Sequence, residues 1–243
     1  MVSLNSLCAS RDFIHNDGAV HIKGFLQEPE KYCNWTHVED ALSRSDMGWE
    51  LINSDGTKRE LGTYKPYWAP TPDVEKEVVW EHLINGLGFV IVGYSRSNQY
   101  IKDLCSDVER EFNVNCCTHV YGGRGLGGSF KCHYDHFANL IIQTKGTTPW
   151  KVYKNRATAL YHSRNDLYHN EEEMVIDWEG DMNPGDLLYI PDRAFHKASP
   201  NGERLSMSIP CMPTIYNSQH YDRRNYTFPN TKSQEGFDPS IDS

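Results

Sequence analysis

The stretch KCHYD, residues 131–135, contains His133, Tyr134 and Asp135, and its spacing determines how the rest of the chain is interpreted. Residues two positions apart on a β-strand project to the same face, so a strand here presents His133 and Asp135 side by side. An imidazole and a carboxylate on one face can share a metal ion. The third ligand must come from a distant part of the chain, and His196 is the candidate.

The surroundings of His196 favour this interpretation. Residues 183–191, NPGDLLYIP, combine a tight turn, an apolar strand and a proline that ends the strand. His196 follows at the start of the next predicted strand, where the mouth of a barrel would present it. Two histidines and one carboxylate form the facial triad of non-haem Fe(II) oxygenases, which leaves coordination positions open for a co-substrate and O₂. We therefore predict His133, Asp135 and His196 as metal ligands and catalytic residues.

The sequence pattern around the triad is typical of an all-β domain. Short β-like segments alternate with turn signals, for example at residues 122–123, 145–146 and 200–202. Strands are predicted at residues 118–121, 131–135, 140–143, 150–153, 173–178, 186–191 and 205–210. Regular short strands of this kind favour a barrel or a sandwich.

The preceding part of the chain is predicted to be mixed. Two short strands and two helices are expected at residues 19–22, 89–93, 35–43 and 74–87. The clearest helix starts at a cap formed by Ser97 or Asn98. Its apolar residues follow helical spacing, namely Ile101, Leu104, Cys105, Val108 and Phe112. Residues 58–72 contain three prolines and are interpreted as a loop packed on the body.

Composition excludes several classes of function. The chain has 243 residues, of which 38% are hydrophobic and 23% charged, and its net charge is −9. It has no block of Lys and Arg, which argues against a nucleic-acid backbone as the main partner. Seven cysteines without a CxxC pair argue against a disulfide framework and favour reduced thiols in a cytosol. The absence of an apolar signal-peptide region and of a membrane-length apolar run predicts an intracellular protein without a membrane span.

On these motifs, the sequence resembles the JmjC and cupin-like Fe(II)/2-oxoglutarate oxygenases, including the ribosomal-protein hydroxylases and the asparaginyl hydroxylase of the hypoxia pathway. The resemblance covers residues 115–213. It is carried by Tyr121, by residues 133–135, by NLIIQTKGTTPWKVY at 139–153 and by GDLLYIPDRAFHKASPNGERLSMSIP at 185–210. Gln143, Gly146 and Trp150 keep the spacing that the family has after its first histidine.

The resemblance implies a fold that is mainly β with flanking helices, a double-stranded β-helix of the jelly-roll or cupin type. It implies that His133, Asp135 and His196 hold Fe(II) and that 2-oxoglutarate chelates the iron as co-substrate for O₂. The expected organisation is one structural domain. Residues 1–114 form a helical and mixed extension packed on the barrel, 115–216 the catalytic core, and 217–243 a polar tail.

The residues expected around 2-oxoglutarate depart from the common pattern in one place. Many family members have Lys or Arg where this chain has Thr148. Other branches of the superfamily bind the far carboxylate with an Arg-x-Ser pair, which Arg204 and Ser206 reproduce. Arg204 suits a bidentate carboxylate contact; the alternative is that it faces solvent at a strand end. Thr148 can add a hydroxyl, while Asn139 and Tyr121 match family positions near the iron and the co-substrate.

Two further residues are candidates for substrate contact. His136 adjoins the triad but projects to the other face of a strand, which favours a substrate or structural contact over a fourth ligand. The glycine-rich loop at residues 122–128 resembles a phosphate loop only in composition, because no predicted helix follows it. We interpret this loop as a mobile flap on which Arg124 could meet a substrate.

The function that these residues imply is hydroxylation of an unactivated C–H bond, with succinate and CO₂ as co-products. The family's commonest target is an amino-acid side chain in a peptide or protein, and a free small molecule stays open. Hydroxylation is preferred over lysine demethylation because the sequence shows no reader module beside the barrel. One alternative is a metal-binding cupin that acts as an isomerase, lyase or sugar-binding module, against which the lack of a His-x-His motif argues. The other is a non-catalytic barrel. The sequence indicates no oligomeric state.

Overall fold

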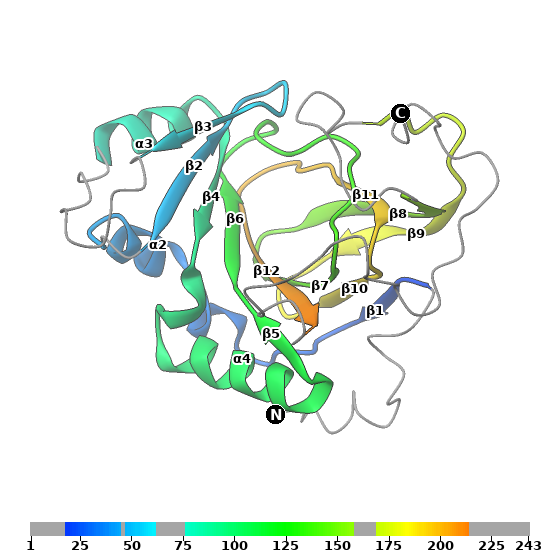
Figure 1. Ribbon diagram of the computed structural model, residues 1–243. Helices are drawn as coiled ribbons and strands as arrows, with labels where there is room; N and C mark the ends of the chain where they lie inside the picture. Colours follow the sequence, from blue (N-terminus) through cyan, green and yellow to red (C-terminus); the bar gives the residue numbers. More distant parts are fainter. Residues whose placement is uncertain (1–17, 45–46, 62–75, 158–168, 214–243) are drawn as a thin grey trace, which may run out of the picture.

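The computed structural model describes residues 18–44, 47–61, 76–157 and 169–213 (Figure 1). The helices are η2 (Pro29–Lys31), α2 (Trp35–Ala41), α3 (Lys76–Ile84), η3 (Tyr94–Arg96) and α4 (Gln99–Phe112). The strands are β1 (Val20–Ile22), β2 (Gly48–Ile52), β3 (Lys58–Leu61), β4 (Gly88–Val92), β5 (Val114–Cys116), β6 (His119–Gly123), β7 (Ala138–Lys145), β8 (Thr148–Arg156), β9 (Ile176–Met182), β10 (Leu187–Ile190), β11 (Ala194–Ala198) and β12 (Arg204–Pro213). The predicted tail at 217–243 lies outside the described residues.

Two antiparallel sheets form the body of the molecule. The larger sheet has the strand order β1-β10-β7-β12-β6-β4-β2-β3, with β5 added alongside β12, and the smaller sheet has the order β11-β8-β9. In Figure 1 the two sheets surround a shared interior. Side chains from β7 and β10 meet side chains from β8, β9 and β11 in one apolar cluster, so the sheets pack face to face. This arrangement confirms the predicted double-stranded β-helix.

The alternation of side chains along β7 assigns one face of the large sheet to the barrel interior. Ile141 packs in the cluster between the sheets, whereas Leu140 and Ile142 pack in the cluster on the other face. Residues two positions apart share a face, so Asn139 and Gln143 also point inward with Ile141. On the neighbouring strand β12, the same alternation turns the polar residues at 204, 206 and 208 inward.

Helices cover the outer face of the large sheet. The largest core cluster joins residues of α2, α3 and α4 to strands β2, β4, β6, β7 and β12. In α4, the Asn98 Oδ1 atom accepts a hydrogen bond of 3.0 Å from the backbone N–H of Ile101, which satisfies a free donor of the first turn. The apolar stripe of α4 packs on the core, as its spacing predicted, with Ile101, Leu104, Cys105 and Val108 buried and Phe112 partly buried.

Several segments differ from the sequence-based predictions. Strand β2 was not predicted, and β3 occupies residues 58–61, where a loop was predicted. The interpretation of residues 62–72 lies outside the described residues. The predicted division after residue 114 falls inside β5, and the large sheet continues across it. Residues 131–135 form an isolated bridge at His133 rather than the predicted strand.

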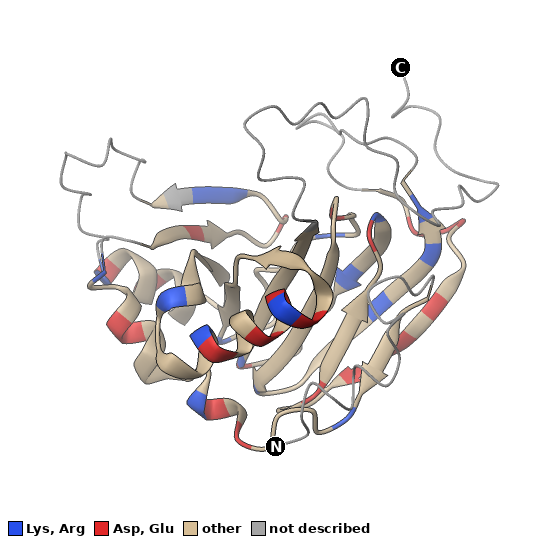
Figure 2. Cartoon of the chain, turned by 60° about the horizontal axis from the view of Figure 1, so that its bottom comes forward, with Lys and Arg blue, Asp and Glu red and all other residues tan. Residues whose placement is uncertain are grey.

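The charged residues are mixed over the surface. Figure 2 shows Asp and Glu residues interspersed with Lys and Arg residues along the helices and strands that come forward in that view. Among the described helices, none combines the length and the apolar character needed to cross a membrane.

The turn between β7 and β8 depends on Gly146. Its φ is +65°, and a Cβ atom there would lie 1.8 Å from the backbone oxygen of Glu203. We expect Gly146→Ala to lower the free energy of unfolding by about 1–3 kcal/mol, because both the backbone conformation and the contact are unfavourable. Urea unfolding measures this change. Gly202→Ala is the control, since a Cβ at Gly202 meets no atom within 4 Å; equal losses in the two variants would contradict the argument.

Candidate metal centre

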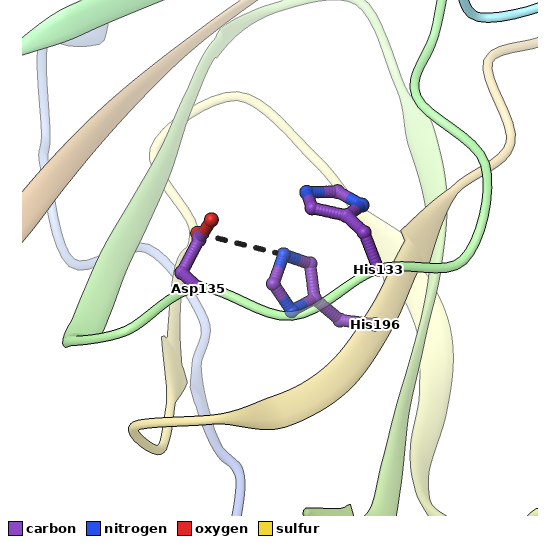
Figure 3. Close-up of side chains that lie close together, drawn as sticks. All are labelled: His133, Asp135 and His196. Carbon is purple, nitrogen blue, oxygen red and sulfur yellow. Dashed lines mark ion pairs between the residues drawn. The ribbon is translucent and has the colours of Figure 1, made fainter. Parts of the chain in front are cut away.

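His133, Asp135 and His196 come together where the segment before β7 meets β11 (Figure 3). The backbones of His133 and His196 pair in both directions, with N···O distances of 3.1 and 2.8 Å. This pairing fixes the two imidazoles on neighbouring chain segments, and their ring centroids lie 4.4 Å apart. One ligand atom from each of the three residues lies within 4.8 Å of the other two. The His196 Nε2 atom is 3.6 Å from Asp135 Oδ2.

The orientation of both imidazoles is fixed by the backbone. His133 Nδ1 lies 2.7 Å from the carbonyl oxygen of Lys131, and His196 Nδ1 lies 2.9 Å from the carbonyl oxygen of Ala194. A carbonyl oxygen only accepts hydrogen bonds, so in the neutral ring Nδ1 carries the proton and Nε2 keeps its lone pair. Metal-binding histidines are commonly held in this way. The geometry therefore leaves both Nε2 atoms available as ligands.

Asp135 is oriented by a hydrogen-bond chain that starts on β12. Ser208 Oγ donates to Asn139 Oδ1 at 2.9 Å, and Asn139 Nδ2 donates to Asp135 Oδ2 at 3.0 Å. The backbone N–H of Arg193 also donates to the carbonyl oxygen of Asp135 at 2.8 Å. Both the side chain and the main chain of Asp135 are thus held in position by hydrogen bonds.

The electrostatic environment favours the forms that bind a cation. Burial, and next the neighbouring His196, lowers the pKa of His133 to about 4, so this imidazole is neutral at physiological pH. Burial acts to raise the pKa of Asp135, but the two imidazoles and the Asn139 amide hold it below its usual range. A carboxylate anion beside a neutral imidazole is the state that a divalent metal requires of its ligands.

The three residues line a pocket with a polar end and an apolar wall. Its cavity volume is about 60 Å³, enough for several water-sized groups. The Trp150 ring stacks near His196 at a centroid distance of 6.1 Å, and Phe130 meets His133 edge-on at 5.6 Å. The side chain of Asp135 is 42% exposed, whereas that of His196 is 3% exposed. The site therefore opens on the side of Asp135.

The other residues predicted around the co-substrate line the same pocket, namely Tyr121, Asn139, Thr148, Arg204 and Ser206. Burial raises the pKa of Tyr121, so its hydroxyl stays protonated. The structure thus gathers at one site the residues that the resemblance implied. Their roles toward a co-substrate stay a prediction.

Arg204 is buried, with 5% of its surface exposed, so the alternative that it faces solvent is wrong. Its guanidinium donates to the carbonyl oxygens of Gly125, Gly127 and Gly128 at 3.2, 3.0 and 2.8 Å. Within the described part of the chain, no carboxylate lies within ion-pair distance of Arg204. Burial lowers its pKa to about 10, which still leaves it charged at neutral pH. Among the described residues, the pocket therefore contains a cation that has hydrogen-bond acceptors but no counter-charge.

Arg124 and His136, predicted to contact substrate, are not among the described residues that line this pocket. The guanidinium of Arg124 lies between two indole rings, 4.6 Å from the ring centroid of Trp35 and 5.1 Å from that of Trp80. Such cation–π contacts tie the glycine-rich loop to α2 and α3. The ring of His136 meets Tyr134 edge-on at 5.8 Å. A role of either residue in substrate binding stays untested.

The glycine-rich loop, predicted as a mobile flap, is closely packed against the end of α3. Gly127 donates its N–H to the carbonyl oxygen of Gly86 at 3.1 Å. A Cβ at Gly125 would lie 2.4 Å from Gly86 Cα, so only glycine allows this approach. Arg204 holds the loop from its other side.

Sequence reasoning missed several residues of the site. Ile52 reaches the pocket from β2, and Ser208 orients Asn139 from β12. Gln143 was noted only for its spacing, although it bonds to Thr148 and Ser206. The sequence spacing could have identified Gln143 and Ser208. Gln143 lies four residues after Asn139 and Ser208 four residues after Arg204, so each shares a strand face with a predicted site residue.

Two imidazoles and one carboxylate converge inside a two-sheet barrel, and this combination defines a cupin-type protein with a candidate metal centre. The sequence model of the JmjC domain matches residues 94–221, which is more than half of the chain. The chain belongs to the JmjC domain family.

Curated relatives are distant. NO66 of Drosophila erecta, a bifunctional lysine-specific demethylase and histidyl-hydroxylase, is 24% identical over 228 residues, which cover 90% of this chain and 33% of that protein. The uncharacterised protein YxbC of Bacillus subtilis (strain 168) is 24% identical over 127 residues, which cover 46% of this chain and 38% of that protein. This chain spans about a third of the length of these relatives.

Solved structures support the same fold. YcfD, a ribosomal oxygenase from Escherichia coli solved in complex with cobalt and 2-oxoglutarate, matches with a TM-score of 0.54 at 15% identity. The match covers 92% of this chain and 60% of that one. YcfD was also solved with cobalt and succinic acid, and that structure matches with a TM-score of 0.53.

The hydrogen bond from Asn139 to Asp135 can be tested by substitution. We expect Asn139→Ala to weaken metal binding roughly 10- to 100-fold, because partners that orient a ligand usually contribute that much. Competition with a chromophoric chelator for Co²⁺ measures the change. Asn155→Ala is the matched control: Asn155 is also buried, but it accepts from the backbone N–H of Val175, away from the pocket. Equal metal affinity in the two variants would contradict a role for Asn139.

Proposed function

We propose that the chain is an Fe(II)- and 2-oxoglutarate-dependent dioxygenase that hydroxylates an amino-acid side chain in a peptide or protein. One observation carries this proposal: a set of two imidazoles and one carboxylate shares a pocket with Arg204, a buried cation to which the described residues supply no counter-charge. The first feature fits a divalent metal, and the second fits a carboxylate-bearing co-substrate.

His133, Asp135 and His196 are the residues that would hold the iron. They fit, because both Nε2 atoms are left free by the backbone contacts of Nδ1 and because Asp135 is oriented as an anion. With O₂ and 2-oxoglutarate, bound Fe(II) supplies the oxidising power to insert oxygen into an unactivated C–H bond, with succinate and CO₂ as co-products. The residues of the chain would bind the co-substrate and the target and shield the reaction from water.

The polar end of the pocket is suited to the far carboxylate of 2-oxoglutarate. Arg204 offers a positive charge there, and Thr148 offers a hydroxyl on the same pocket wall. Burying an arginine without an anion is costly, so a bound carboxylate would relieve an existing penalty. YcfD, which has a similar fold, was solved in complex with cobalt and 2-oxoglutarate, and this supports the assignment.

The walls of the pocket shield the reaction and leave one side open. Trp150, Phe130 and Ile52 line the cavity with apolar surface, which excludes water from the metal side. The exposed side of Asp135 leaves an entrance for the target residue. A side chain that reaches in from a larger molecule fits an entrance beside a small cavity.

A protein substrate is supported by the names of the relatives. NO66 is named a lysine-specific demethylase and histidyl-hydroxylase, and YcfD a ribosomal oxygenase; the first name refers to amino-acid residues, which favours a side chain as the target. Because this chain spans a third of NO66, the particular residue is not carried over. A free small molecule as substrate is the competing outcome.

Anaerobic spectroscopy tests the proposal directly. Adding 2-oxoglutarate to the Fe(II)-loaded protein without O₂ should produce a weak visible charge-transfer band, since the 2-oxo acid chelates the metal. Admitting O₂ should then convert 2-oxoglutarate to succinate. A metal-loaded protein that gives neither the band nor succinate would contradict the oxygenase and favour a metal-binding cupin of another class.

A further inference from the structure

Gln143 lies at the centre of a buried hydrogen-bond network beneath the polar end of the pocket. Its side chain is fully buried. The two protons of the Nε2 atom serve three acceptors, the carbonyl oxygens of Lys145 and Gly146 at 2.8 and 3.2 Å and Thr148 Oγ1 at 3.1 Å, so one proton is shared between two of them. The Oε1 atom accepts a hydrogen bond of 2.6 Å from Ser206 Oγ. One amide therefore joins the β7–β8 turn to β12.

The direction of each hydrogen bond in this network is determined by chemistry. Carbonyl oxygens only accept, so the amide end that faces Lys145 and Gly146 must be the –NH₂ group. Its opposite end is then an oxygen that can only accept, which requires Ser206 to donate its hydroxyl proton. Reversing the amide would place two oxygens against each other at the turn. The network thus has a single polarity.

This polarity determines what Thr148 and Ser206 can offer a ligand. Thr148 Oγ1 already accepts from Gln143, and among the described residues no acceptor binds its own proton, so that proton is available to the pocket that Thr148 lines. Ser206 donates its hydroxyl hydrogen to Gln143, so it can offer a ligand only the lone pairs of its oxygen. A carboxylate needs donors, so Thr148 suits it and Ser206 does not.

We infer that Gln143 is a positioning residue that makes Thr148 a hydrogen-bond donor to the far carboxylate of 2-oxoglutarate, whose charge Arg204 balances. This inference rests on the proposed function. It also gives a structural account of Thr148, which stands where many relatives have a basic residue: the charge comes from Arg204 on β12, and Thr148 adds a directed hydroxyl. Ser206 acts on the co-substrate only through Gln143.

The test measures 2-oxoglutarate affinity of the anaerobic Fe(II)-loaded protein through the charge-transfer band, so no turnover is needed. Thr148→Val, which removes only the hydroxyl, and Gln143→Met should each weaken binding about tenfold, the usual effect of one hydrogen bond to a charged group. The double variant should lose no more than either single variant, because the two residues act as one unit. Thr148→Ser restores the hydroxyl and should bind nearly as the unaltered protein does.

Controls separate this role from a general structural one. Thr144→Val removes a buried hydroxyl of the next β7 residue, which bonds to the Leu205 carbonyl, and should leave 2-oxoglutarate affinity unchanged. 2-Oxobutyrate, which chelates the metal but lacks the far carboxylate, should bind all variants equally. If Gln143→Met does not fold, the comparison of Thr148→Val with Thr148→Ser carries the test, because both variants leave Gln143 in place.

The outcomes distinguish this inference from the proposed function. Unchanged 2-oxoglutarate affinity in Thr148→Val, with a normal band in the unaltered protein, would overturn the inference and leave the oxygenase intact. Independent, multiplying losses in the double variant would show that Gln143 does not act through Thr148. Absence of the band from the unaltered Fe(II)-loaded protein would overturn the proposed function and the inference with it.

Discussion

His133→Ala should abolish succinate formation and weaken metal binding by more than about 100-fold, beyond the effect usual for residues that only orient a ligand. The variant removes one of three proposed ligands whose atoms lie within 4.8 Å of one another. Fold stability should change little, because the backbone pairing of His133 with His196 needs no side chain. Metal titration, a succinate assay and a circular-dichroism melt measure these three quantities.

His136→Ala is the matched control for this prediction. His136 lies close to His133 in the chain, yet its ring meets Tyr134 and Phe137 rather than the metal pocket. We expect His136→Ala to keep metal affinity, whether or not it changes affinity for the substrate. Equal loss of metal in both variants, or turnover that survives in His133→Ala, would remove the proposed ligand set.

The triad could be predicted from sequence although one step of the reasoning was wrong. A strand at residues 131–135 was expected to place His133 and Asp135 on one face, but the segment pairs only at His133. A single bridge to His196 gives the same juxtaposition that a full strand would give. The spacing of two residues was therefore informative, because it indicates which side chains share a face. This also holds where extended backbone forms only a single bridge.

Local signals predicted the elements that carry their own pattern. The helix α4 was recognisable because its apolar stripe and the Asn98 cap lie within one continuous segment. Strand β7 was recognisable as a short apolar run. By contrast, β2 and β3 contain charged residues such as Glu50 and Lys58, and they become strands by pairing with β4 and with each other. Such pairing depends on long-range register, which the local sequence does not report.

The orientation of Arg204 shows the same limit inside the site. An Arg-x-Ser pair has two possible faces, and sequence spacing alone does not choose between them. The choice follows from the register of β12 against β6, in which Arg204 lies opposite Gly123. A glycine there leaves room for the guanidinium, because a Cβ at Gly123 would lie 2.5 Å from the Arg204 Nη1 atom. The burial of Arg204 thus depends on Gly123, and this dependence can be recognised only when the pairing of the two strands is known.

Arg204→Met should weaken 2-oxoglutarate binding by about 100-fold or more, because truncating one partner of a buried charged contact commonly costs 2–5 kcal/mol. Metal affinity should be retained, since no contact joins Arg204 to the triad in the described chain. The affinity for 2-oxobutyrate should also be retained, because that acid lacks the far carboxylate. Titration of the anaerobic Fe(II)-loaded variant with each acid separates these expectations.

The variant also removes the hydrogen bonds that hold the glycine-rich loop, so lost stability must be separated from lost binding. Arg156→Met is the control, because Arg156 is equally buried but pairs with Asp192 outside the pocket. It should lower the unfolding free energy without changing 2-oxoglutarate affinity. Should Arg204→Met bind both acids as the unaltered protein does, the buried cation would serve the loop alone, and the carboxylate of the co-substrate would need a different partner.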